Sequence, residues 1–263
     1  MRTAERLEHR IRRLAGQAIG DFGMIRDGDK VLVGLSGGKD SLTLLHVLLH
    51  KKSVAPVRFD VGAVTVDPQI QGFDPSPLKA YLQRLDVPYF FVSQPIVEEA
   101  RIRMEGDTFC AYCSRMKRGI MYTTARREGY KVLALGHHLD DLAESFFLSV
   151  FHNGSLHTMK AHYVNEDGDI RVIRPLIYVR EHETRDFAHT AALPIIPSTC
   201  PACSPHFRVP TQRRHMKQLL AQEEKNNPRL FDSILAAVRP LLDGFREEAV
   251  SRQNASDRSL QNY

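Results

Sequence analysis

Short apolar runs alternate with longer amphipathic stretches along most of this chain of 263 residues. The first run, Val31 to Leu35, is rich in β-branched and aliphatic residues and predicts a buried strand. Further runs predict strands at 59–66, 89–92 and 132–135, and helical patterns lie at 42–49, 78–85, 114–128 and 139–151. This alternation indicates an α/β fold, a doubly wound and mostly parallel sheet with helices on both faces.

The pattern changes after residue 160. Residues 160–169 are polar and predict a loop, and 171–179 predict an extended segment that Pro175 limits to an edge or a strand start. Helical patterns return at 181–191, 211–225 and 229–245. We therefore expect a basic helical segment at 1–28, the α/β domain at 29–200, a helical C-terminal extension at 201–250 and a disordered tail at 251–263.

The turn between the first strand and its helix is rich in glycine. It consists of Ser36, Gly37, Gly38, Lys39, Asp40 and Ser41. Glycine lets backbone N–H groups approach an anion, and the helix N-terminus adds the positive end of its dipole. The turn therefore predicts a phosphate or pyrophosphate cradle, although its spacing is not that of a Walker A loop. The alternative is ordinary turn chemistry, in which Asp40 or Ser41 caps the helix.

A second turn from strand to helix carries two histidines and two aspartates. It contains Gly136, His137, His138, Asp140 and Asp141. One aspartate could simply cap the following helix. The alternative is that a carboxylate binds Mg²⁺ on nucleotide phosphates or acts as an acid or base, with a histidine near the nucleotide. Because ligands bind at the carboxyl ends of parallel strands, we expect both turns at one edge of the sheet.

All four cysteines belong to two C-x-x-C pairs, Cys110 with Cys113 and Cys200 with Cys203. Four thiolates could form a closed structural zinc site, whereas three could hold an iron–sulfur cluster with one iron open for chemistry. The first pair precedes a basic helix, whose dipole and cations favour the thiolate form. The spacing alone favours zinc, and the phosphate cradle in the same chain favours the cluster.

The net charge of +5 is concentrated in a few places. Basic residues crowd the N-terminal helix, the helix after the first cysteine pair and the helix after residue 211, which suits a polyanion such as RNA. The candidates for RNA binding are Arg115, Arg118, Arg126, Arg127, Arg213 and Arg214. The alternative is that these residues form ordinary solvated helix faces. No stretch is apolar enough for a membrane helix, and the charged N-terminus argues against a secretory signal, so we expect a cytoplasmic protein without membrane contact.

The glycine-rich turn resembles the PP-loop of the ATP pyrophosphatase superfamily, whose fold is that of the adenine nucleotide alpha hydrolases. With the other motifs, the chain resembles the tRNA 2-thiocytidine synthetase family of sulfurtransferases over about residues 22 to 220. The motifs that carry the resemblance are, in order, Ser36 to Ser41, Gly72-Phe73, Val87-Pro88-Tyr89, Cys110 to Gly119, Gly136 to Asp141, Ile173 to Leu176 and Ile195 to Pro197.

This resemblance implies that ATP and Mg²⁺ bind at the cradle, Gly136 and His137, and that ATP adenylates the C2 oxygen of cytidine 32 in a tRNA anticodon loop. Sulfur then replaces the adenylated oxygen. The resemblance also implies a [4Fe-4S] cluster on Cys110, Cys113 and Cys200, with Cys203 a weaker candidate ligand. The residues implied in catalysis are Lys117, Asp40 and either Asp140 or Asp141.

The resemblance further implies a sulfur donor, either a cysteine desulfurase or sulfide, and a homodimer. One departure is that Ser204-Pro205-His206 follows the second cysteine pair, where the family usually has Gly-Ser-Gln. Two alternatives stay open. The enzyme could thiolate a tRNA uridine or a small molecule, or the chain could be a zinc-stabilised RNA-binding protein with a vestigial nucleotide loop.

Overall fold

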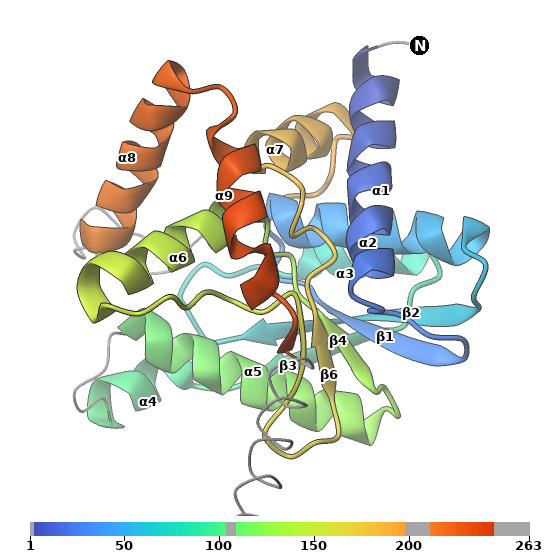
Figure 1. The fold of residues 1–263 in the computed structure, drawn as a ribbon. Helices are drawn as coiled ribbons and strands as arrows, with labels where there is room; N and C mark the ends of the chain where they lie inside the picture. The colour runs from blue at the N-terminus through green and yellow to red at the C-terminus, as the bar shows by residue number, and fades with distance from the viewer. Residues whose placement is uncertain (1–2, 104–108, 198–210, 245–263) are drawn as a thin grey trace, which may run out of the picture.

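The computed structural model describes residues 3–103, 109–197 and 211–244 (Figure 1). Within them, six strands form one sheet in the order β3-β2-β1-β4-β6-β5. The strands are β1 (Asp29–Gly34), β2 (Phe59–Asp67), β3 (Tyr89–Ser93), β4 (Val132–Ala134), β5 (His162–Val164) and β6 (Arg171–Ile173). All neighbouring pairs are parallel except β5 with β6, so the predicted mostly parallel sheet is confirmed.

Helices cover both faces of this sheet (Figure 1). They are α1 (Thr3–Asp21), α2 (Lys39–Val54), α3 (Ser76–Arg84), α4 (Ile96–Arg103), α5 (Phe109–Arg127), α6 (Leu139–Asn153), α7 (Glu181–Thr190), α8 (Thr211–Asn226) and α9 (Leu230–Val238). Figure 1 places α4 and α5 on one side of the sheet and α1, α2, α6 and α7 on the other. No helix of the described part is long and apolar enough to cross a membrane.

The central strand β1 explains the continuous apolar run in the sequence. Val31 and Val33 belong to the larger core, which α1, α2 and α6 also line, whereas Leu32 belongs to the core beneath α5. All three side chains are fully buried. Successive side chains of a strand point to opposite faces, so a strand covered on both faces has no solvent side that requires polar residues.

Three elements differ from the prediction. The segment 160–169, which we expected to be a polar loop, contains β5. Its composition does not predict a strand, and it forms one because it pairs with β6. Helix α4 was not predicted. The helix expected at 229–245 ends at Val238 and continues as a 3₁₀ turn at Arg239–Leu241, because Pro240 lacks the N–H that an α-helix interior needs.

The terminal segments pack on the same core as the sheet. Helix α1 contributes Ile11, Ala15 and Ala18 to the larger cluster, and α9 contributes Phe231 and Ile234. The four-part division of the chain remains a prediction.

Candidate functional site

The glycine-rich turn joins β1 to α2 as predicted. Gly37 has a φ of +82°, which is accessible to glycine at little cost. Two hydroxyls brace the turn from inside, because Ser36 Oγ and Ser41 Oγ lie 3.2 Å apart and Ser41 Oγ donates to the Gly38 carbonyl at 2.9 Å. Ile196 covers the turn from outside, where its N–H donates to the Gly37 carbonyl at 2.9 Å.

The first turn of α2 has no side-chain cap within the described residues. Its N-cap is Gly38, in an extended conformation, so the alternative that Asp40 or Ser41 caps this helix is wrong. The first N–H groups of a helix have no partner inside the helix. Together with the helix dipole, they make this end of α2 suited to bind an anion through backbone donors.

Asp40 lies at the centre of a polar network beside this turn. Lys39 Nζ binds its carboxylate at 2.9 and 3.0 Å, and Thr184 Oγ1 donates to it from α7. His138 Nε2 lies 3.8 Å from the same carboxylate. Lys39 Nζ also lies 3.5 Å from Glu181, so α7 closes the network from the far side.

The second turn, between β4 and α6, packs directly against the first. A Cβ atom on Gly136 would lie 3.1 Å from the backbone carbon and oxygen of Asp40 and from the backbone nitrogen of Ser41. Backbone cannot yield as a flexible side chain does, so this approach requires glycine. The two turns predicted to share one edge of the sheet therefore meet.

The start of α6 is capped by its own side chains. His138, which is buried, is the N-cap and accepts from the Asp141 N–H at 3.3 Å through Nδ1. Asp141 returns the bond by accepting from the His138 N–H at 3.1 Å, which completes a capping box. The predicted aspartate cap is therefore only partly right, because the N-cap residue is His138 and Asp141 completes the capping box from the third helical position.

Asp140 has different partners. It accepts from the Arg180 guanidinium at 3.1 to 3.2 Å and from the Glu181 N–H at 2.7 Å. Sequence reasoning missed both partners, since neither belongs to a recognisable motif. Arg180 also pairs with Glu224 of α8 at 2.6 Å and stacks 3.4 Å over the Phe231 ring of α9.

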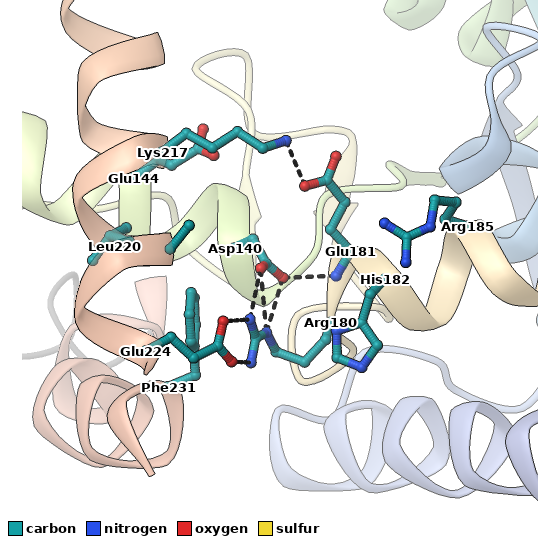
Figure 2. Close-up of a pocket in the computed structure, with 11 residues that line it drawn as sticks. Asp140, Glu144, Arg180, Glu181, His182, Arg185, Lys217, Leu220, Glu224 and Phe231 are labelled. Atoms are coloured by element: carbon teal, nitrogen blue, oxygen red, sulfur yellow. Dashed lines mark hydrogen bonds and ion pairs between the residues drawn. The ribbon is translucent and has the colours of Figure 1, made fainter. Parts of the chain in front are cut away.

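These residues border a cavity of about 230 Å³ between α6, α7, α8 and α9 (Figure 2). Figure 2 shows Asp140, Arg180 and Glu224 on one side and Lys217 paired with Glu181 on the other. Acidic and basic side chains are nearly balanced along the lining, so the cavity has no strong preference for an anion.

His137 follows Gly136 and is partly buried. Its Nδ1 accepts from Arg174 Nε at 3.3 Å. Burial, together with the positive charges of Arg174, Arg213 and Arg118, lowers the pKa of His137 to about 3. This imidazole is therefore neutral at physiological pH.

The first cysteine pair lies at the start of α5, on the other side of the sheet. Cys113 is buried beside Ile96 and Ile120. Lys117 follows one turn later and is half-buried, so the two side chains lie on one face of the helix. Further along α5, Met121 packs against Gly34 at the end of β1.

The proposed cluster ligands are only partly described. The Cys110 side chain, Cys200 and Cys203 lie outside the described residues. Among the side chains that are described, no group of three His, Cys, Asp or Glu is placed to hold a metal ion.

The arginines proposed for RNA binding differ in their contacts. Arg126 binds Asp167 and Asp169, Arg127 binds Glu128, and Arg213 binds Asp141 and Glu144. Arg115 and Arg214 are exposed, and Arg118 is half-buried. RNA binding by these residues stays a prediction.

Comparison with known proteins places the chain in a family. A family model described as a PP-loop domain matches residues 4–198. The chain is 43% identical over 240 residues to the tRNA-cytidine(32) 2-sulfurtransferase of Pseudomonas fluorescens (strain SBW25), covering 90% of this chain and 85% of the relative. It is also 43% identical over 240 residues to the enzyme of that name from Stenotrophomonas maltophilia (strain R551-3), covering 90% of this chain and 79% of the relative.

A solved structure has the same fold. The U34-tRNA thiolase NcsA from Methanococcus maripaludis, solved with its [4Fe-4S] cluster, superposes with a TM-score of 0.75 at 22% identity. The match covers 91% of this chain and 80% of that one.

Proposed function

This chain belongs to the PP-loop family of tRNA-cytidine(32) 2-sulfurtransferases, and we propose that it uses ATP to replace the C2 oxygen of cytidine 32 in tRNA with sulfur. The observation that carries the proposal is the contact between the two turns. The uncapped, glycine-rich start of α2 lies against Gly136, directly beside a histidine and aspartate cluster. This arrangement combines a phosphate cradle with side chains suited to proton and metal chemistry.

ATP binds with its phosphates at the start of α2. The backbone N–H groups of this turn and the helix dipole hold the phosphate oxygens, and Lys39 leaves Asp40 and Glu181 to neutralise their charge. Asp40, once Lys39 has left it, and Asp140, once Arg180 has left it, are the carboxylates that would bind Mg²⁺ carried by the nucleotide.

Activation converts a poor leaving group into a better one. The cytidine C2 oxygen attacks the α-phosphorus of ATP, the bond from that phosphorus to the bridging oxygen breaks, and pyrophosphate leaves. Sulfur then bonds to C2, the bond from C2 to the adenylated oxygen breaks, and AMP departs with both electrons of that bond. Donors at the start of α2 stabilise the charge that develops on the phosphoryl oxygens.

The thiol chemistry fits an iron–sulfur cluster. Cys113 is buried at the start of α5, and Ile196, the fourth residue before Cys200, lies on the cradle. Four residues span at most about 14 Å, which allows Cys200 to act near the nucleotide. When bound by three thiolates, a [4Fe-4S] cluster supplies one open iron site for sulfide. Lys117, one turn from Cys113, adds positive charge where anionic sulfur and AMP are handled.

The reaction also requires a sulfur donor and a tRNA. A cysteine desulfurase or free sulfide supplies the sulfur, and the enzyme works as a homodimer in the cytoplasm. The target base is single-stranded and flipped out, as in other enzymes that carry out chemistry on a base.

Two variants test whether activation and sulfur delivery are separate. Cys110→Ala should abolish 2-thiocytidine formation and keep ATP binding, whereas Asp40→Ala should keep bound iron and lose ATP-dependent pyrophosphate release. Mass spectrometry of nucleosides from digested tRNA measures the product, and equilibrium dialysis measures ATP binding. If each variant loses 2-thiocytidine formation and ATP binding to the same extent, the proposal is wrong.

The same assays separate the alternatives. If the tRNA contains a thiolated uridine in place of 2-thiocytidine, the target base of the enzyme is a uridine. Protein purified without oxygen should contain about four irons and absorb broadly near ~400 nm, as a cluster held by thiolates does. One bound zinc without iron, and no pyrophosphate release, would instead identify an RNA-binding protein with a structural zinc site.

A further inference from the structure

Arg174 is a buried arginine whose contacts differ from those of a structural ion pair. It directly follows β6 at the carboxyl edge of the sheet and is 5% exposed. Its guanidinium donates to the Lys160 carbonyl and to His137 Nδ1, and it lies 5.4 Å over the Tyr163 ring. Among the described residues, no carboxylate pairs with it, although burying an unneutralised charge is costly.

The contact with His137 determines which imidazole nitrogen carries the proton. Arginine has only N–H donors, so the Nδ1 atom that receives Arg174 Nε–H at 3.3 Å must be unprotonated. The single proton of the neutral ring is then on Nε2. Burial, together with the positive charges of Arg174 and Arg213, lowers the pKa of His137 and keeps the ring in this neutral form.

His137 Nε2 is a donor without a protein acceptor in the described part of the chain. Within that part, Nδ1 is the only ring nitrogen that forms a hydrogen bond. Nε2 does not belong to the buried polar atoms that lack a partner, so it is accessible. The residue next to it, Gly136, contacts Asp40 and Ser41 of the cradle. The Nε2–H group of His137 therefore belongs to the turn that contacts the cradle.

We propose that Arg174 is a positioning residue that holds His137 as the tautomer with its proton on Nε2, so that Nε2–H donates to an oxygen of the bound substrate. The identity of that substrate rests on the function proposed above. The acceptor is an oxygen of the reacting centre, either on the α-phosphate of the nucleotide or at C2 of the cytidine. Arg174 polarises the ring from behind and strengthens this donor.

Nitrogen NMR of protein labelled with ¹⁵N-histidine tests the tautomer directly. The chain has 12 histidines, and the signal lost in His137→Gln identifies the one of interest. We expect an unprotonated Nδ1 and a protonated Nε2 at neutral pH. A protonated Nδ1 would overturn the proposal. This readout needs no activity, so it stays informative even if the proposed reaction is wrong.

Two ligands distinguish the sources of the acceptor. If the acceptor is a phosphate oxygen, a non-cleavable ATP analogue with a methylene group between the α and β phosphorus atoms shifts the Nε2–H signal. If the acceptor is at C2 of the base, the signal shifts only when an anticodon stem-loop RNA is added as well. A signal that responds to neither ligand would overturn the donor role.

Variants of β6 and the residue that follows it separate positioning from folding. Arg174→Met removes the charge and the donor, and we expect a mixture of both His137 tautomers. Arg171→Met is the matched control, because Arg171 starts the same strand and pairs with the Asp29 carboxylate. It should lower stability and leave the His137 signal unchanged. A single tautomer retained in Arg174→Met would overturn the proposal.

If Arg174→Met fails to fold, the ¹⁵N spectrum of the unaltered protein still decides the proposal, because it reads the His137 tautomer directly. The rate of thiolation provides a second, kinetic test. His137→Gln keeps an N–H donor near the position of Nε2, and it should retain about tenfold more thiolation than His137→Met, the size expected for one hydrogen bond. Equal activities of these two variants would contradict the donor role.

Discussion

The two turns at the carboxyl edge of the sheet have the same topology and opposite chemistry. Each leads from a parallel strand into a helix, β1 into α2 and β4 into α6. At α2 the N-cap is a glycine with no side-chain cap in the described residues, whereas at α6 His138 and Asp141 cap each other. An uncapped start leaves backbone donors for a ligand, and a capped start uses them within the protein.

This difference indicates that the two turns, which contact each other, have different roles. The first turn is suited to hold phosphates through its backbone, and the second presents side chains such as His137 and Asp140. Gly136 allows the two to approach within contact distance. Three predictions test the comparison.

The largest effect is expected at Gly37. In Gly37→Ala, the φ of +82° becomes strained, and the new Cβ would lie 3.0 Å from Ile196. We expect ATP affinity to fall about 100-fold, equal to ~2.7 kcal/mol. Isothermal titration calorimetry measures it.

Gly154→Ala is the control for backbone strain. Gly154 has a φ of +59° at the end of α6, with no atom within 4 Å of a new Cβ. This variant should lose stability and keep its ATP affinity. If both variants bind ATP equally well, the cradle is not formed by the first turn.

A smaller effect is expected at the capped turn. His138→Ala removes the N-cap of α6, and we expect the free energy of unfolding to fall by about 2 kcal/mol. Urea denaturation measures it. Asparagine is a strong N-cap residue, so His138→Asn should recover about 1 kcal/mol. Equal stability of the two variants would show that capping is not what His138 contributes.

The last prediction concerns pH. The pKa of His137 is about 3 in the folded protein, whereas an ordinary histidine has about 6.5, so on acidification the unfolded chain binds a proton that the folded one does not. Stability from this residue is complete above the unfolded pKa and is lost as the pH falls. Between about pH 6 and about pH 4, we expect the slope of unfolding free energy against pH to be smaller in His137→Gln by up to ~1.4 kcal/mol per unit.

Other histidines provide the background for this measurement. Burial also lowers the pKa of His46 and of His162, so these residues contribute slopes of the same sign in both proteins. The difference between the two slopes is the informative quantity. Identical slopes would mean that His137 is protonated alike in the folded and unfolded chains.

The sequence by itself determined the strands β1 to β4, most helices and the position of both turns. Local patterns suffice there, because a strand buried on both faces needs an unbroken apolar run and an anion cradle needs glycine next to a helix start. The family resemblance carried the assignment from these motifs to a tRNA sulfurtransferase, which the relatives support.

Only the tertiary structure decided which side chains surround the turns. Arg174 meets His137, Arg180 meets Asp140 and Ile196 covers Gly37, although each pair is separated by 37 or more positions in the chain. The same holds for β5, which is a strand only because β6 lies beside it. Such contacts arise from the packing of distant elements, so a pattern read over neighbouring residues contains no signal for them.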